Sequence, residues 1–159
     1  MKRYISIALV LLLLSAVVSA HADTPQISGK LFSTAKQALV YLASGEYERL
    51  VTLLPFSDVS PSAAEWHDFA EGNFSTLHSG VQTEYSVAYW NGSCWKVAVP
   101  VAPPGDGNVE ALVLTSADGK AFSGYRYSNW SNVCSEYESA SYVTWNKEYI
   151  GSEPMIVVD

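Results

Sequence analysis

The spacing of apolar residues changes once along this chain, near Thr83, and that change constrains the fold more than any other feature. Before it, apolar residues recur at intervals of three and four, which places them on one face of a helix. After it, they alternate with polar residues, as in a half-buried strand. Helices followed by antiparallel hairpins are typical of an α+β domain. The sequence therefore predicts N-terminal helices packed on a curved antiparallel sheet, a cone-like arrangement with a concave cavity at its open end.

Local start and stop signals divide the helical part into three segments. The first helix begins with a capping-box pattern at Thr34 and Gln37 and ends before Gly45. The third begins with Ser60 as its N-cap and Pro61 in its first turn. The predicted helices cover residues 34–44, 47–54 and 60–72.

The first hairpin turns at Asn91-Gly92, a strong turn signal. A two-residue loop would pair Tyr89 with Cys94, whereas a three-residue bulged loop would pair Tyr89 with Ser93. Because the register of a strand follows its apolar face, we expect the bulged loop, which sets Val87 opposite Trp95. This register predicts one apolar face formed by Tyr85, Val87, Trp95 and Val97.

A second hairpin is expected to turn at residues 117–119. The same bulged geometry would set Glu110 opposite Arg126, a favourable pair of opposite charges on neighbouring strands. Residues 142–145 are a candidate for a fifth strand, and residues 155–158 are a candidate for a sixth strand, with a docked tail as the alternative.

The N-terminus predicts export. Lys2 and Arg3 precede an apolar run over residues 5–18, and Ala20-His21-Ala22 supplies small residues for cleavage, which is the pattern of a secretory signal peptide. The run is shorter than the roughly 20 residues of a membrane-spanning helix, although a retained anchor is the alternative. We therefore expect residues 1–22 to be removed and residues 23–159 to form one secreted or periplasmic domain.

Several motifs carry a resemblance to a known family. The order of elements is similar to the nuclear-transport-factor-2-like superfamily (cystatin-like cone), and within it to uncharacterised exported bacterial domains. The resemblance covers about residues 33–128, and the tail from Val133 departs from the pattern. It implies the cone fold, but its members include enzymes and binding modules, so it implies no particular activity. The residues that carry it are Ala43–Tyr47, Val59-Ser60-Pro61 with Trp66, and Asp118-Gly119-Lys120 continuing to Gly124-Tyr125.

Charge and cysteine content narrow the possible partners. Loss of Lys2 and Arg3 with the leader would change the formal net charge from −7 to −9, so nucleic acid and anionic lipid are excluded as partners. Cys94 and Cys134 are the two cysteines of the chain. In an oxidising compartment a disulfide between them is expected, with two separate thiols as the alternative.

The chain offers few groups for catalysis. Histidine and cysteine are too sparse for a zinc site, and no phosphate-binding glycine loop is present. His67 lies beside Asp68, but neighbouring helical residues do not face each other, and His78 lies in a polar loop. The sequence therefore predicts no metal, no cofactor and no assigned catalytic residue.

The leading functional hypothesis is a non-catalytic binding module for a small apolar molecule, a glycan or a protein partner. Its binding residues would be the four of the predicted apolar face together with Trp90 and Trp130. One alternative is a small enzyme with a buried carboxylate or histidine, for which Glu84, Glu110 and His67 are the candidates. Another is an interaction or inhibitor domain that uses exposed Trp90 and Trp130 as anchors.

Overall fold

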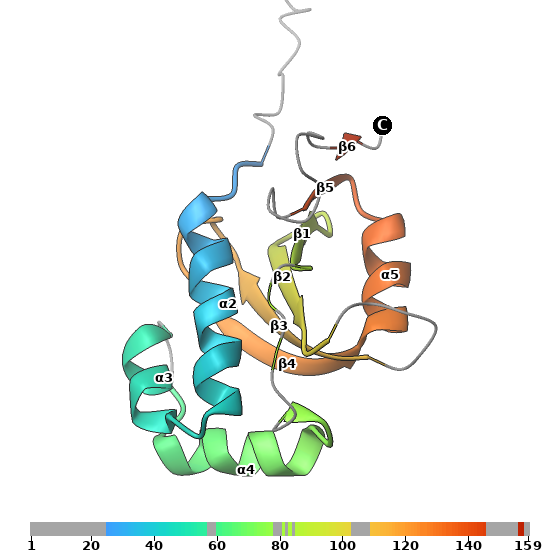
Figure 1. Ribbon diagram of the computed structural model, residues 1–159. Coiled ribbons are helices and arrows are strands. Elements are labelled where there is room, and N and C mark those ends of the chain that lie inside the picture. The colour runs from blue at the N-terminus through green and yellow to red at the C-terminus, as the bar shows by residue number, and fades with distance from the viewer. Residues whose placement is uncertain are drawn as a thin grey trace, which may run out of the picture.

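The protein has three layers, with a central sheet and helices on both of its faces (Figure 1). The computed structural model describes residues 25–56, 60–77, 81, 83, 85–102, 109–145 and 156–157. Three N-terminal helices lie on one face of the sheet and a fourth lies on the other. The predicted α+β class is thus confirmed. The helices are α2 (Gly29–Ala43), α3 (Tyr47–Leu53), α4 (Ala63–Asn73) and α5 (Trp130–Glu138).

The sheet is antiparallel throughout and open, with the order β4-β3-β2-β1-β5-β6. The segments at 142–145 and 155–158 contribute β5 and β6, as predicted. The strands are β1 (Val87–Trp90), β2 (Trp95–Pro100), β3 (Glu110–Ser116), β4 (Gly124–Asn129), β5 (Tyr142–Trp145) and β6 (Ile156–Val157).

The N-cap of helix α2 lies six residues earlier than predicted. Its N-cap is Ser28, whose hydroxyl oxygen accepts a hydrogen bond of 3.3 Å from the Lys30 N–H, so Thr34 lies inside the helix. The apolar face extends back to Leu31, and burying that residue favours the longer helix. The helix ends as expected, because Gly45 adopts a φ of 70° that side chains disfavour.

Helix α4 begins two residues later than predicted. Ser62 is its N-cap and forms a reciprocal capping box with Glu65, in which the Ser62 N–H donates to the carboxylate at 2.7 Å. Ser60 instead accepts from the Phe56 N–H at 3.0 Å and closes the preceding loop. A glutamate three residues downstream satisfies a second backbone donor, and this distinguishes the true cap from Ser60. The helix also continues past Gly72.

The predicted register of the first hairpin is wrong. Residue Trp90 pairs with Trp95 and Val87 pairs with Ala98, so the loop has four residues. The side-chain amide oxygen of Asn91 accepts from the Cys94 N–H at 2.9 Å and fixes that loop. Both faces of β1 and β2 are buried, so the apolar residues did not mark one face and could not define the register.

The register of the second hairpin is also wrong, by three residues. Glu110 pairs with Asn129 rather than with Arg126, and Leu112 pairs with Tyr127. The loop is longer than predicted because the Asp118 carboxylate accepts from two backbone N–H groups that follow it.

The segment before α2 lies against this second turn. The Ser28 N–H donates to the Gly119 carbonyl at 2.8 Å. Gly119 has a φ of 71°, and a Cβ there would overlap the carbonyl oxygen of Gln26. The contact fixes the turn relative to the start of α2.

Two hydrophobic cores fill the space on either side of the sheet. Helices α2, α3 and α4 cover one face, where Val97, Val99, Leu112 and Leu114 are fully buried. Helix α5, which the sequence analysis missed, covers the other face over Val87, Tyr89 and Val113. Side chains of the helices therefore occupy the inner face that was expected to form a concave cavity.

Candidate functional site

The residues expected to line one binding face lie in different parts of the structure. Trp95 and Val97 belong to the core beneath the N-terminal helices, whereas Val87 belongs to the core beneath α5. Tyr85 precedes β1 and is half-buried. The expectation that the four share a face is wrong, because the observed register places Val87 and Trp95 on opposite faces. Any role of these residues in binding stays a prediction.

The two tryptophans expected as exposed anchors are not equivalent. Trp130 opens α5 and is buried, with 6% of its surface exposed, because it packs between that helix and the sheet. Trp90 is half-buried at the end of β1, with its ring 5.9 Å from that of Trp95. Trp130 is therefore a core residue, contrary to the expectation.

The expected disulfide is also wrong, since both cysteines are free and half-buried. Cys94 lies in the β1–β2 turn, with its sulfur 3.5 Å from the Asn91 amide oxygen. Cys134 lies in the middle of α5 and accepts a contact of 3.4 Å from the Tyr137 hydroxyl. The turn and the helix hold the two thiols in separate environments.

Aromatic side chains instead gather between α4 and β4. The Trp66 and Tyr125 rings are 4.1 Å apart, and Phe69 and Phe56 pack on Tyr125 at 4.9 and 5.7 Å. Trp66 is fully buried, as its predicted core role requires. This cluster stabilises the packing of α4 on the sheet edge.

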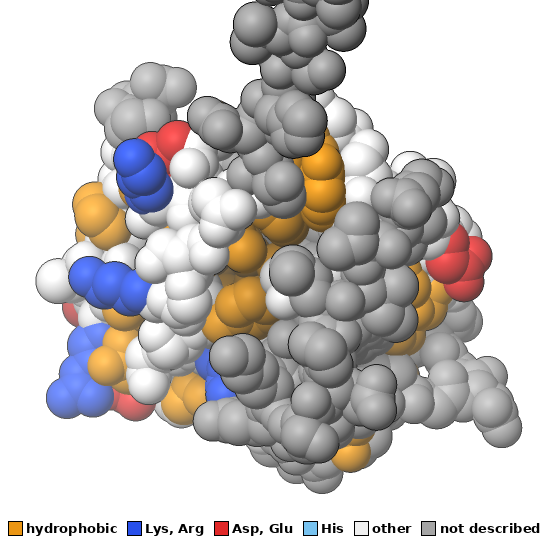
Figure 2. All heavy atoms as spheres, turned by 90° about the horizontal axis from the view of Figure 1, so that it is seen from above, with side chains coloured by type: hydrophobic (Ala, Val, Ile, Leu, Met, Phe, Trp, Pro, Cys, Tyr) orange, Lys and Arg blue, Asp and Glu red, His pale blue; other side chains and the backbone are white. Residues whose placement is uncertain are grey.

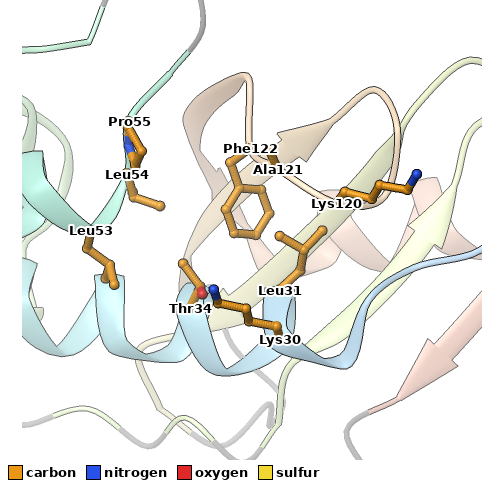
Figure 3. Close-up of a pocket in the computed structure, with 9 residues that line it drawn as sticks. All are labelled: Lys30, Leu31, Thr34, Leu53, Leu54, Pro55, Lys120, Ala121 and Phe122. Atoms are coloured by element: carbon orange, nitrogen blue, oxygen red, sulfur yellow. The ribbon is translucent and has the colours of Figure 1, made fainter.

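An open pocket of about 180 Å³ lies where α2, the end of α3 and the β3–β4 turn meet (Figure 3). We call it the α2–turn pocket. Its walls are formed mainly by apolar side chains, and two lysines and one threonine also line it. Its lining residues are Lys30, Leu31, Thr34, Leu53, Leu54, Pro55, Lys120, Ala121 and Phe122.

Local structure explains how three distant segments meet in this pocket. Leu31 and Thr34 are three residues apart on α2 and therefore point to the same side. Pro55 follows the end of α3, which leaves Leu53 and Leu54 facing that side of α2. The turn held by Asp118 brings in Phe122, whose ring stands opposite Leu54 in Figure 3.

The lysines sit at the mouth of the α2–turn pocket. Both side chains are exposed. In Figure 3 the Lys30 ammonium lies beside Thr34, one helical turn away, whereas the Lys120 ammonium extends away from the pocket. Figure 2 shows that most of the Lys and Arg side chains visible from above lie along the side that carries α2 and α3. Asp and Glu side chains are visible beside them, so this side carries charges of both signs.

A wider groove continues from this pocket between α2 and α3. It has a volume of about 640 Å³ and is lined by Tyr41, Glu48, Arg49, Thr52 and Leu53. Leu53 is shared with the α2–turn pocket. The Arg49 guanidinium lies 5.7 Å from the centre of the Tyr41 ring, at the far end of the groove.

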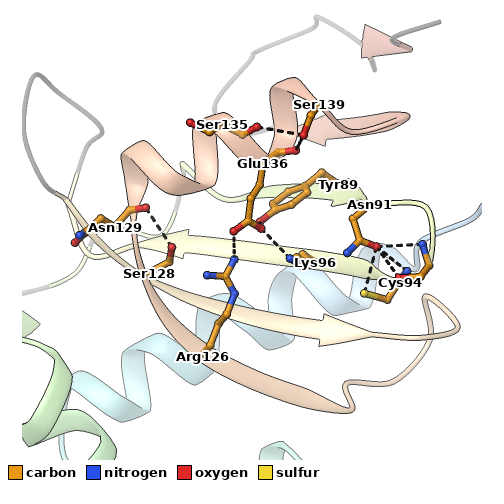
Figure 4. Close-up of polar contacts among 11 residues, drawn as sticks. Tyr89, Asn91, Cys94, Lys96, Arg126, Ser128, Asn129, Ser135, Glu136 and Ser139 are labelled. Carbon is orange, nitrogen blue, oxygen red and sulfur yellow. Dashed lines mark hydrogen bonds and ion pairs between the residues drawn. The ribbon is translucent and has the colours of Figure 1, made fainter.

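A polar centre on the opposite face joins α5 to the sheet (Figure 4). The Glu136 carboxylate accepts from the Tyr89 hydroxyl and the Lys96 ammonium, each at 2.8 Å, and from the Arg126 guanidinium at 2.5 Å. Burial raises the pKa of Glu136, but these hydrogen bonds and positive charges outweigh it and hold the pKa below its usual range. Burial and the same carboxylate raise the pKa of Tyr89. Hydrogen bonds and ion pairs to the ionised Glu136 carboxylate therefore link α5 to the sheet.

Glu110 is buried but fully hydrogen-bonded. Its carboxylate accepts from the backbone N–H and the hydroxyl of both Ser75 and Thr76, at 2.7 to 3.0 Å. Burial raises the pKa of Glu110, but the four hydrogen bonds outweigh it and lower the pKa overall. The expected partner Arg126 binds Glu136 instead. These hydrogen bonds from Glu110 therefore connect the segment after α4 to β3.

Among the remaining candidates for acid–base chemistry, His67 does not line the α2–turn pocket. His67 is exposed on α4, 3.4 Å from the Asp68 carboxylate and edge-on to the Tyr47 ring. Glu84 and His78 lie outside the described residues. Within the described ranges, no group of three or more His, Cys, Asp or Glu side chains is arranged to hold a metal ion.

Comparisons with known proteins place no further constraint on the site. No family model, no curated protein and no solved structure matches the chain. Among the described helices, none is both long and apolar enough to cross a membrane.

Proposed function

We propose that this chain is an exported, non-catalytic binding domain of the nuclear-transport-factor-2-like class, with its binding site in the α2–turn pocket. The observation that carries the proposal is an open pocket with apolar walls formed by Leu31, Leu54 and Phe122, and with two lysines at its mouth. The leader pattern supports export, and helices packed on a curved antiparallel sheet support the class.

The size and charge of the pocket favour one kind of ligand group. Sites that enclose a drug-sized molecule have volumes of about 300–1,000 Å³, so a pocket of about 180 Å³ suits a single apolar group of a larger ligand. Burying that group against the leucines and Phe122 supplies a hydrophobic gain. An anion beside Lys30 adds an attraction that the net negative charge elsewhere does not provide.

The test uses hexanoate, which combines a short apolar chain with a carboxylate. In an NMR titration of the purified chain, saturable shifts are expected in the amides of residues 30–34 and 120–122. A Thr34→Trp substitution should abolish them by filling the pocket, whereas Ser33→Trp, on the exposed side of the same helix, should leave them intact. Shifts scattered over the surface, or unaffected by Thr34→Trp, would overturn the proposal.

A charge substitution separates the contribution of the lysines. Lys30→Gln should weaken hexanoate binding by about threefold to fivefold, since an exposed ion pair contributes up to about 1 kcal/mol. Lys36→Gln, with the same change of net charge on α2 but outside the pocket lining, is the matched control. Equal effects of the two substitutions would mean that the lysine at the mouth has no local role.

A further inference from the structure

We infer that the occupant of this site is an extended peptide segment of a protein partner, which inserts an apolar side chain beside a carboxylate into the α2–turn pocket and runs along the groove between α2 and α3. The inference rests on the proposed function and names the class of its ligand. It is carried by the continuity of the two depressions and by the order of chemical groups along them.

The two depressions form one track. Leu53 lines both of them. On α2, Thr34 lies four residues after Lys30, and Tyr41 lies eleven residues after it. At 100° per residue, the three side chains leave the helix within about 40° of one another. With a rise of 1.5 Å per residue, the track from Lys30 to Tyr41 is about 16 Å long. An extended peptide advances about 3.3 Å per residue, so about five residues would span it.

The lining of the track favours a peptide over an acyl chain. The α2–turn pocket is too small for a long hydrocarbon. Beyond Leu53 the groove offers the Thr52 hydroxyl, the Tyr41 ring and charged groups of both signs. A hydrocarbon lying there would cover polar groups without forming hydrogen bonds, which is costly. A peptide carries amide groups and side chains that can pair with them.

The charges give the track a direction. Lys30 and Lys120 lie at the pocket end, which favours a carboxylate on the ligand. At the other end Glu48 lines the groove, and Arg49 forms an ion pair of 2.6 Å with Glu46. Two carboxylates against one guanidinium make that end negative, so it favours a neutral or basic residue. The partner segment is therefore acidic and apolar at one end and neutral or basic at the other.

The experiment compares short synthetic peptides blocked at both ends and labelled for fluorescence anisotropy. Two probes, Asp-Leu-Ser-Thr-Lys and its reversed sequence Lys-Thr-Ser-Leu-Asp, match the charges in either chain direction. A third, Lys-Leu-Ser-Thr-Asp, exchanges the charges. One matched peptide should bind the purified chain about tenfold more tightly than the exchanged one, the product of two exposed charge pairs.

Two substitutions test the path of the peptide. Thr52→Trp should block the far part of the groove, so it should weaken the matched peptide while leaving hexanoate binding unchanged. The control is Ser135→Trp, at an exposed position of α5 on the other side of the sheet, which should change neither peptide binding nor hexanoate binding. If hexanoate binds but no matched peptide gains over the exchanged one, or Thr52→Trp has no effect, the inference is overturned and the proposed function stands. If neither hexanoate nor any peptide binds, both are overturned.

Discussion

Replacement of Glu110 by glutamine gives the sharpest test of how the described structure is held together. Glu110 is 7% exposed, and its carboxylate accepts four hydrogen bonds from Ser75 and Thr76, which lie 35 and 34 residues away in the chain. Glu110→Gln keeps the shape of the side chain. Its amide oxygen can still accept from one of the two residues, but its NH₂ group would face the N–H and O–H donors of the other.

The expected loss of stability follows from the bonds removed. Two of the four hydrogen bonds are lost, and each bond to a charged acceptor contributes about 1.5–3 kcal/mol. Because the bonds are only partly buried, we use the lower value and expect the free energy of unfolding to fall by about 3 kcal/mol at pH 7. Urea unfolding followed by tryptophan fluorescence measures this free energy. Glu138→Gln, at an exposed position of α5, is the control with an equal change of charge.

The pH dependence supplies an independent check. The folded pKa of Glu110 is lowered, so its contribution is complete above the ordinary value of 4.5 and disappears as the pH falls through the lowered folded value. The difference between the native chain and Glu110→Gln should therefore stay constant from pH 7 to about 5 and shrink at lower pH. The reasoning is refuted if Glu110→Gln costs no more than Glu138→Gln, or if its effect is unchanged in acid.

Three further predictions concern the Glu136 contacts, the Gly119 turn and the two cysteines. Glu136→Gln should destabilise the chain by about 1–2 kcal/mol and speed amide exchange in α5, since it weakens all three contacts to the sheet; unchanged exchange would contradict this. Gly119→Ala should cost more than 2 kcal/mol in urea unfolding, whereas Gly92→Ala, also at positive φ but in open space, should cost about 1 kcal/mol; similar losses would show that the contact before α2 contributes nothing. Cys94 and Cys134 should both react with iodoacetamide in the folded chain, and an intact mass that rises on reduction would reveal a disulfide instead.

The sequence predicted elements better than it predicted their partners. The positions of α3, β5 and the end of α2 followed from local signals such as Pro55 and Gly45. Helix α5 was missed although Asn129, a residue type favoured at N-caps, precedes it, because the helix follows β4 directly and no loop separates the two elements. The true cap of α4 could have been found, since Ser62 and Glu65 have capping-box spacing.

The candidate site could not have been read from local patterns. Lys30, Leu53 and Phe122 belong to three segments, and nothing in the spacing of apolar residues shows that they meet. The predicted site residues were chosen from a strand register that assumed one apolar face. With helices on both sides, Val87 and Trp95 are both buried although they lie on opposite faces.

What the sequence alone determined is the class of the domain, because helical and alternating periodicities are local properties of the chain. The tertiary structure decided the strand registers and the location of the pocket. When both faces of a sheet are covered, successive residues of a strand are all buried although they point to opposite faces. Alternation of apolar and polar residues then no longer identifies a face. The α2–turn pocket exists only because a helix start, a helix end and a turn are brought together by packing.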